Sequence, residues 1–285
     1  MIRFEPVDTV VGAVVSGCDL TQVPDQDDIA LIEAALEKYG VLIFRDQQIS
    51  PAQQIAFSRA FAALERTSRV SARLDGHPEI FVVGNVDGKV VSFAPADGSD
   101  ELEWHADHMH LAVPARASML YCLETPPVGG ETLFACMYAA YDALSAEAKD
   151  RAEGLTALHS VSGLQTFLRT KGVKGAAEGE YTSPETLTVR WPLVRHHPLT
   201  GRKALYFGSK VTIGIEGWPD EKARPYLTRL EAEATAERFR YAHAWRPGDA
   251  VLWDNRRVLH AGTPYDMRYP RRMHRTTWRE EHPIA

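Results

Sequence analysis

The sequence contains little cysteine. Only three cysteines occur among 285 residues, at positions 18, 122 and 136, and no two of them are close together. An odd number of widely spaced cysteines does not make a disulfide framework, and sparse cysteine is typical of proteins from reducing compartments. We therefore expect a cytoplasmic protein whose fold is held together without disulfides.

Long apolar runs and clusters of like charge are also missing. No stretch approaches the roughly 20 apolar residues of a membrane-spanning helix, and residues 1–6 lack the apolar segment of a signal peptide. The formal net charge is -6, and no run of lysine or arginine provides a surface for a polyanion. We expect neither a membrane nor a nucleic acid as a partner.

The remaining composition is that of an ordinary globular protein. Hydrophobic residues make up 45% of the chain and charged residues 25%, which leaves enough apolar surface for a core that needs no metal or disulfide support. No repeat and no linker-like stretch divides the sequence. We expect one domain over residues 1–285.

Local patterns predict helices early in the chain and strands later. Apolar residues at helical spacing predict a helix that ends at Gly40, followed by a short buried strand over Val41–Phe44. Ser50 and Pro51 are typical of a helix start. From about residue 66 onward, short apolar or alternating runs are separated by glycine, proline and aspartate, at 80–83, 118–123, 155–161, 204–207, 250–253 and 274–278.

These runs predict a mainly β fold, a sandwich or barrel of antiparallel strands with flanking α-helices. Helices are expected near 139–150 and in the second half of 218–236, where Pro225 should begin or kink the second of them. Two segments, 97–100 and the stretch from Lys171 to Thr186, are poor in core-forming residues. The longer one is either a surface loop or a lid over an active site.

His105 and Asp107 form the first pattern that carries chemistry. Strand side chains alternate, so residues two apart point to the same side and can bind one metal ion together. Two histidines and one carboxylate on one face leave positions open for iron to bind a chelating cosubstrate and dioxygen. Chance predicts roughly 1.5 His-x-acid matches in a chain of this composition, and there are two. The other match, at 77–79, contains proline, and we interpret it as a turn before a strand that begins at residue 80.

Longer motifs around these residues resemble one enzyme family. The chain has Trp-His-Ala-Asp at 104–107, Pro-Pro-Val-Gly-Gly-Glu-Thr at 126–132, His-Pro-Leu-Thr-Gly-Arg-Lys at 197–203, Trp-Arg-Pro-Gly-Asp at 245–249 and Trp-Asp-Asn-Arg at 253–256. Two N-terminal segments, Gly-Val-Leu-Ile-Phe-Arg-Asp-Gln at 40–47 and Gln-Gln-Ile-Ala-Phe at 53–57, fit the same pattern. In this order, over nearly the whole chain, the motifs resemble those of the TauD/TfdA family of Fe(II)- and 2-oxoglutarate-dependent dioxygenases.

The resemblance implies a double-stranded β-helix (jelly-roll) core and an iron centre. It makes His105, Asp107 and His260 the iron ligands and catalytic residues. Arg271 corresponds to the arginine that pairs with the distal carboxylate of 2-oxoglutarate, and Thr132 to the hydroxyl that hydrogen-bonds to it. The expected cofactors are Fe(II), the cosubstrate 2-oxoglutarate and O2. The expected reaction is hydroxylation of a small organic substrate, with release of succinate and CO2. Hydroxylation beside a heteroatom would lead to cleavage of the carbon–heteroatom bond.

Two further residues are expected at the substrate. Arg275 lies four residues after Arg271, so a strand would place both on one side. In taurine-type members of the family this position binds the anionic group of the substrate, which implies an acidic substrate here; the alternative is a structural ion pair. Tyr206 corresponds to an aromatic residue that lines the pocket in the family.

The chain also departs from the taurine enzymes, at two more candidate substrate-binding residues. Glu101 stands where those enzymes carry an asparagine, and His108 where they carry a small apolar residue. Their substrate-binding histidine and tyrosine are not found in the region 66–73. Taurine is therefore not expected as the substrate. His108 faces the substrate if the strand ends at Asp107, and it is structural if the strand continues.

Two other classes of protein share parts of this pattern. A zinc hydrolase could bind its metal with the same three ligands, but it gives no role to Arg271 and Thr132. A non-catalytic small-molecule binding protein on the same scaffold is the other alternative. Association into a homo-oligomer is expected by analogy with the family alone.

Overall fold

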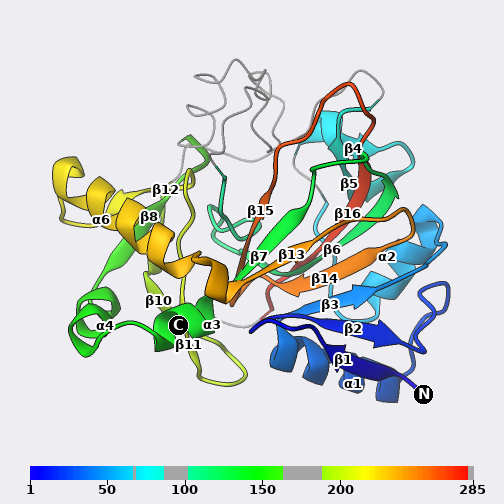
Figure 1. The fold of residues 1–285 in the computed structure, drawn as a ribbon, viewed down its shortest axis with the longest axis horizontal. Coiled ribbons are helices and arrows are strands. Elements are labelled where there is room, and N and C mark those ends of the chain that lie inside the picture. The colour runs from blue at the N-terminus through cyan, green and yellow to red at the C-terminus, as the bar shows by residue number, and fades with distance from the viewer. Residues whose placement is uncertain (67–68, 87–101, 163–187, 282–285) are drawn as a thin grey trace.

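The computed structural model describes residues 1–66, 69–86, 102–162 and 188–281, and a large β-sheet forms its centre (Figure 1). The sheet has eight strands in the order β1-β2-β3-β14-β6-β16-β5-β4. Neighbouring strands are antiparallel except for β2 and β3, which run parallel. The strands are β1 Arg3–Pro6, β2 Ala13–Ser16, β3 Val41–Phe44, β4 Arg73–Leu74, β5 His77–Gly84, β6 Ala115–Glu124, β14 Ala250–Asp254 and β16 Arg272–Arg279.

Three smaller sheets complete the β structure. The first has the order β13-β7-β15, with β7 Thr132–Cys136, β13 Arg240–His243 and β15 Val258–Gly262. The second has the order β12-β8-β9, with β8 Thr156–His159, β9 Val189–Pro192 and β12 Thr212–Ile215. The third pairs β10 Val194–His196 with β11 Lys203–Leu205. The expected fold class, mainly β around a jelly-roll core with flanking helices, is confirmed.

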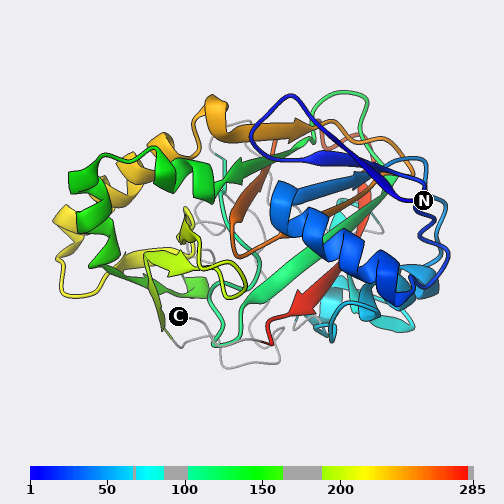
Figure 2. The ribbon, with the colours of Figure 1, turned by 90° about the horizontal axis from the view of Figure 1, so that it is seen from below.

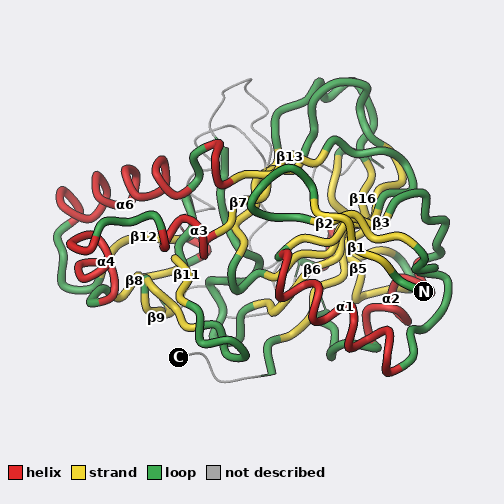
Figure 3. Tube along the Cα trace, turned by 60° about the horizontal axis from the view of Figure 1, so that its bottom comes forward, coloured by secondary structure: helices red, strands yellow, loops and turns green. Residues whose placement is uncertain are grey.

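The helices form two groups (Figures 2 and 3). The first group, α1 Gln26–Tyr39 and α2 Pro51–Arg59, lies beside the large sheet. The second group lies at the other end of the molecule and comprises α3 Met137–Asp142, α4 Ala146–Glu153 and α6 Asp220–Ala234. Two short 3-10 helices, η1 Val70–Ala72 and η2 Glu237–Phe239, occur in connections. None of the helices in the described ranges combines the length and apolar character needed to cross a bilayer.

The large sheet buries both of its faces. Because strand side chains alternate, Leu42 and Phe44 of β3 pack with Leu36 of α1 on one face. Val41 and Ile43 point to the other face, where the core includes residues of β7 and β15. The candidate site lies on this second face, between the large sheet and the sheet β13-β7-β15.

Local predictions in the N-terminal part are confirmed. Helix α1 ends at Gly40, which has φ 74°, a left-handed conformation that costs glycine little. Ser50 caps α2: its side chain accepts from the backbone N–H of Gln53, and the Gln53 side chain accepts from Ser50 in return. These caps fix where the chain enters and leaves strand β3.

One prediction about local structure is wrong, and two others hold only in part. Residues 77–79 belong to β5 and are not a turn; Pro78 is tolerated because β5 bonds to β16 only over residues 81–84. Helix α6 begins at Asp220, favoured by the acidic residues of its first turn, so Pro225 does not begin the helix. A kink at Pro225, the other alternative, stays a prediction. The helical stretch expected near 139–150 is present as two helices, α3 and α4, with Ser145 capping the second.

Candidate metal centre

His105 and His260 face each other across a short antiparallel bridge. The His105 N–H donates to the His260 carbonyl at 3.0 Å, and the His260 N–H donates to the His105 carbonyl at 2.8 Å. The two ring centroids are 4.2 Å apart. Since β15 is also paired with β7 at Phe134, the backbone of His260 is held from two sides.

Asp107 completes a group of three possible ligands. One donor atom from each of His105, Asp107 and His260 lies within 4.8 Å of the other two. Within the described residues this is the one such group of three or more histidine, cysteine and acidic side chains. All three side chains are at least partly buried. Folding thus brings together the three residues that the sequence suggested as metal ligands.

A hydrogen-bond network fixes the Asp107 carboxylate. Ser118 on β6 donates to Oδ2 at 2.6 Å, and the Asp107 N–H donates to the Asn255 side chain at 3.0 Å. Asn255 in turn donates to Ser118 and accepts from Trp253, both at 3.0 Å. Arg275 donates to Oδ1 of Asp107. Burial raises the pKa of Asp107, but Arg275 and the neighbouring histidines outweigh it, so the pKa lies well below its usual range.

Both histidines are held in the neutral form, which can bind a cation. Nδ1 of His105 is 2.9 Å from the Glu103 carbonyl, which can only accept, so Nδ1 carries the hydrogen and Nε2 is left as a lone-pair donor. Nδ1 of His260 is buried without a hydrogen-bond partner in the described part of the chain. Burial lowers the pKa of both imidazoles, that of His260 further. Neutral imidazoles are the form that binds a metal.

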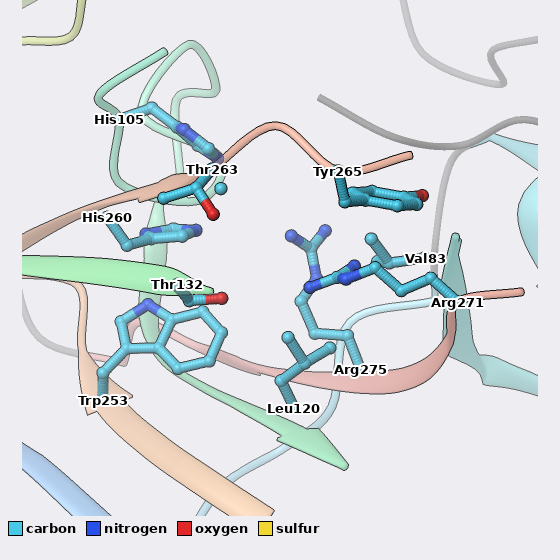
Figure 4. Close-up of a pocket in the computed structure, with 11 residues that line it drawn as sticks. Val83, His105, Leu120, Thr132, Trp253, His260, Thr263, Tyr265, Arg271 and Arg275 are labelled. Atoms are coloured by element: carbon cyan, nitrogen blue, oxygen red, sulfur yellow. The ribbon is translucent and has the colours of Figure 1, made fainter. Parts of the chain in front are cut away.

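A pocket opens beside these residues (Figure 4). Figure 4 shows the side chains of Arg271 and Arg275 extending toward the space that His105 and His260 also face. Thr132 lines the same pocket. The complete lining is Val83, His105, Leu120, Thr132, Trp253, His260, Gly262, Thr263, Tyr265, Arg271 and Arg275.

Arg271 carries a buried charge without a carboxylate partner in the ranges that the structure describes. It is 5% exposed, Nε has no hydrogen-bond partner there, and the guanidinium carbon lies 5.8 Å from the centre of the Tyr265 ring. Burial lowers its pKa. An uncompensated charge in a protein interior is costly. The pocket is therefore suited to an anion that meets Arg271.

A family model described as taurine catabolism dioxygenase TauD, TfdA family matches residues 3–277. The chain belongs to the TauD/TfdA family.

Several relatives of this TauD/TfdA member are named for the reactions that they catalyse. The chain is 36% identical over 284 residues to the alpha-ketoglutarate-dependent 2,4-dichlorophenoxyacetate dioxygenase of Cupriavidus pinatubonensis, with 95% of this chain and 96% of that protein covered. It is 37% identical over 279 residues to the (S)-phenoxypropionate/alpha-ketoglutarate-dioxygenase of Sphingobium herbicidovorans, with coverage of 94% and 91%. It is 32% identical over 266 residues to pentalenolactone F synthase of Streptomyces arenae, with coverage of 90% and 87%.

A solved structure agrees with these relatives. The structure of AAD-2 in complex with Mn(II) and N-oxalylglycine matches with a TM-score of 0.82 and 32% identity, and all of both chains is covered. The TauD/TfdA enzyme described here is a non-haem iron dioxygenase that uses Fe(II), 2-oxoglutarate (alpha-ketoglutarate) and O2. Its substrate is a small organic molecule. Two neutral imidazoles and one carboxylate are the donor set expected for such an iron site.

Two roles were considered for Arg275, binding of an acidic substrate and a structural ion pair, and its position is compatible with both. It faces the same pocket as Arg271, as the strand spacing predicted. One of its nitrogens is paired with Asp107, so the structural ion pair is present. Its Nε is buried and has no hydrogen-bond partner in the described residues. Binding of an acidic group by Arg275 stays a prediction for this TauD/TfdA enzyme.

The other substrate candidates lie away from the pocket lining or outside the described residues. The chain turns after Asp107: His108 has φ 56°, so the strand does not continue there, and its ring lies 6.3 Å from that of His110. Tyr206 is 2% exposed and packs under the Arg195 guanidinium at 4.2 Å. Glu101 and the stretch 171–186 fall in undescribed ranges. The substrate roles of these residues stay predictions.

The sequence did not reveal the residues that hold Asp107. Ser118 is fully buried in a strand that is otherwise mostly apolar, and Asn255 is 1% exposed. A polar side chain inside an apolar strand needs a hydrogen-bond partner, and that was the available signal for Ser118. For Asn255 the signal was its place in the motif at 253–256.

Replacing Asn255 with alanine should weaken metal binding about tenfold to a hundredfold, because partners that orient a metal ligand have effects of this size. Calorimetric titration with Mn(II) measures the change. Gln54→Ala is a matched control: that amide is also fully buried, and it bonds to the His274 carbonyl on the α2 side of the large sheet. The control should lose stability and keep its metal affinity. An Asn255 variant that binds Mn(II) as tightly as the native protein would contradict the role given to this network.

Glu103 makes stability depend on pH. It is 3% exposed, and burial raises its pKa from 4.5 to about 8, although Lys210 opposes the shift. The folded protein therefore favours the neutral acid, whereas the unfolded chain ionises from about pH 4.5 upward, so stability falls as the pH rises from that value toward 8.

Replacing Glu103 with glutamine should remove this dependence. The free energy of unfolding of the variant, relative to the native protein, should rise between pH 5 and pH 8 by at most about 1.4 kcal/mol per pH unit. Urea unfolding at both pH values measures it, with Glu147→Gln as the control because that side chain is 85% exposed. The same difference in stability at pH 5 and pH 8 would show that Glu103 is ionised in the folded protein.

Proposed function

We propose that this enzyme hydroxylates a small organic acid, with 2-oxoglutarate oxidised to succinate and CO2, and that His105, Asp107 and His260 hold the iron. One observation carries the proposal: a three-ligand group and a buried guanidinium without a carboxylate partner open into the same pocket. A metal site alone would fit many reactions. The metal site together with Arg271 fits a cosubstrate that has a chelating group at one end and a carboxylate at the other.

The residues of the pocket take separate roles in the proposal. His105 and His260 bind the metal as neutral imidazoles, and Asp107 supplies the negative charge that partly balances it. Arg271 and Thr132 bind the distal carboxylate of 2-oxoglutarate and set its orientation. The apolar walls formed by Val83 and Leu120 limit water in the pocket. Bound at these residues, Fe(II) would supply the one-electron chemistry that activates dioxygen, while 2-oxoglutarate and the substrate C–H bond would each give up two electrons.

The substrate class follows from Arg275 and from the relatives. Two relatives are named for 2,4-dichlorophenoxyacetate and (S)-phenoxypropionate, both of which carry a carboxylate and an ether oxygen on neighbouring positions of a short chain. Arg275 faces the pocket, and since only Nη1 of its guanidinium is paired with Asp107, the group can also donate to such a carboxylate. We therefore place aryloxyalkanoates first among the candidate acids.

Hydroxylation of such an acid would lead to cleavage of its ether bond. One oxygen atom of O2 enters the C–H bond beside the ether oxygen, and the other enters succinate. The product is a hemiacetal, which loses the phenol as its leaving group and leaves a 2-oxoacid. For a substrate without a heteroatom beside the attacked carbon, the reaction ends at the alcohol.

A succinate-release screen tests the function and the charge of the substrate together. Aryloxyalkanoic acids, sulfonates, phosphonates and amino acids are compared, and each active acid is paired with its neutral amide. We expect release with an acid and little with its amide. If the preferred compound is neutral, the acidic-substrate proposal fails; if no 2-oxoglutarate turnover occurs under any condition, the reaction class fails too.

Replacing Arg275 with glutamine should raise the KM for the acid about tenfold to a hundredfold and should largely remove the preference for the acid over its amide. The loss of preference is the deciding measurement, because Arg275 also pairs with Asp107 and its removal can weaken metal binding. Arg272→Gln is the control: the neighbouring arginine pairs with Glu124 and does not line the pocket. A variant at Arg275 that keeps the full preference for the acid would contradict this role.

A further inference from the structure

We propose that Trp245 is a positioning residue for 2-oxoglutarate: its indole N–H directs the hydroxyl hydrogen of Thr132 toward the distal carboxylate. The inference rests on the proposed function, because it concerns the same pocket. Trp245 does not line that pocket. It acts through Thr132, whose Oγ accepts from the Trp245 indole nitrogen at 2.9 Å.

The direction of this hydrogen bond is fixed by chemistry. An indole nitrogen can only donate, so the Thr132 oxygen must be the acceptor. A threonine hydroxyl has one hydrogen of its own, and here that hydrogen is not engaged by Trp245. Within the described residues no acceptor lies within hydrogen-bond distance of it, and the side chain lines the pocket. The hydroxyl is left as a donor for a ligand.

Both partners are held in place. Thr132 is 4% exposed and begins β7, where its backbone lies between His243 of β13 and Gly262 of β15. Trp245 is 7% exposed, and its ring meets the His243 ring edge to face at 4.4 Å and 79°. The Thr132 oxygen is therefore fixed in position, and because the indole N–H occupies one side of it, the hydroxyl hydrogen is directed to the remaining sides.

The segment that carries Trp245 is itself anchored by one carboxylate. Oδ2 of Asp249 lies 3.2 Å from Nε2 of His243 and accepts from the backbone N–H of Arg246 at 2.9 Å. Arg45 on the far side donates to the same oxygen. These contacts fix the chain on both sides of Trp245, at His243 and Arg246, so the indole reaches Thr132 without reorganisation.

The consequence is selectivity for a dicarboxylate. A hydroxyl that already points its hydrogen at the site of the distal carboxylate binds that group with little loss of rotational freedom. A 2-oxoacid that ends in a methyl group, such as 2-oxovalerate, gains nothing from the same hydroxyl. Trp245 should therefore affect the affinity for 2-oxoglutarate and leave that for 2-oxovalerate unchanged.

Replacing Trp245 with phenylalanine tests this, since the ring stays and the N–H is lost. On Mn(II)-loaded protein, the Kd for 2-oxoglutarate should rise roughly fivefold to tenfold, the effect of one weakened hydrogen bond to a charged group. The Kd for 2-oxovalerate should change less than about twofold. In a Thr132→Val background the Trp245 substitution should add nothing, because the two residues act as one unit. Trp191→Phe is the control, because it also removes an indole hydrogen bond, the one to the Met109 carbonyl.

The outcomes separate this inference from the proposed function. If the native protein binds 2-oxoglutarate no better than 2-oxovalerate, the proposed function fails. Suppose that Thr132→Val weakens 2-oxoglutarate binding. The positioning role is then overturned, and the proposed function survives, if Trp245→Phe leaves 2-oxoglutarate binding unchanged or weakens the binding of both oxoacids equally. The same holds if the effect of Trp245→Phe adds to that of Thr132→Val. Should Trp245→Phe not fold, 15N resonances of the native protein decide. The Trp245 indole N–H should exchange slowly and should lose this protection in Thr132→Val, and an unchanged exchange rate would overturn the role.

Discussion

Replacing Asp107 with alanine should lower 2-oxoglutarate-dependent succinate release by at least about a hundredfold. Asp107 is the one carboxylate of the three-ligand group, and without it the metal keeps two neutral ligands and loses a negative charge. Succinate release at saturating Fe(II) and 2-oxoglutarate measures the effect. Near-native activity of the variant would remove Asp107 from the metal site.

The same substitution should also destabilise the fold, and the two effects can be separated. Asp107 is 3% exposed and pairs with Arg275, so alanine leaves a buried charge uncompensated at a cost of about 3 to 5 kcal/mol. A second variant, Asp107→Ala with Arg275→Leu, removes that charge. It should recover most of the free energy of unfolding in urea while its activity stays lost. Recovery of activity along with stability would mean that Asp107 acts only through the fold.

Replacing Arg271 with alanine should raise the Kd for 2-oxoglutarate at least about thirtyfold, because the distal carboxylate loses a buried, charged partner. Calorimetric titration of the Mn(II)-loaded protein measures it. Arg268→Ala is the control, since that arginine lies three residues before Arg271, is 86% exposed and pairs with Asp266. The control should bind 2-oxoglutarate as the native protein does.

The effect of Arg271 on stability should have the opposite sign to that of Asp107. Arg271 has no carboxylate partner in the described residues. Alanine therefore removes a buried charge and leaves no opposite charge unpaired. Without ligand, the free energy of unfolding should stay the same or rise. A large loss of stability together with unchanged affinity for 2-oxoglutarate would make Arg271 a structural residue.

Features set by neighbouring residues could be predicted from the sequence. Gly40 ends α1 and Ser50 caps α2 because each acts on backbone groups within one helical turn. The strand Val41–Phe44 follows from a run of four apolar residues between two such signals. The turn predicted at Pro78 and the helix start predicted at Pro225 are both absent for the same reason. Pro78 and Pro225 lie where the missing N–H is not needed or removes a single bond, so proline did not set the boundary.

The candidate site could be predicted only in part. Spacing suggested that His105 and Asp107 share a side, and the family resemblance added His260, Arg271 and Thr132. The contacts that orient these residues join distant parts of the chain: Asp107 and Asn255 are 148 residues apart, and Asp107 and Arg275 are 168. No local pattern encodes such a pair, because either residue alone would serve equally well elsewhere.

In the proposed enzyme, 2-oxoglutarate binds the metal at one end and Arg271 at the other. The most direct test of this arrangement is the absorption spectrum of the protein with Fe(II) and 2-oxoglutarate in the absence of oxygen. Chelation of Fe(II) by the keto acid should produce a weak visible charge-transfer band that requires both additions, saturates at one equivalent of each, and needs far more 2-oxoglutarate in Arg271→Ala. A protein that binds the metal but shows no band would contradict the account and would favour a zinc enzyme or a non-catalytic binding protein.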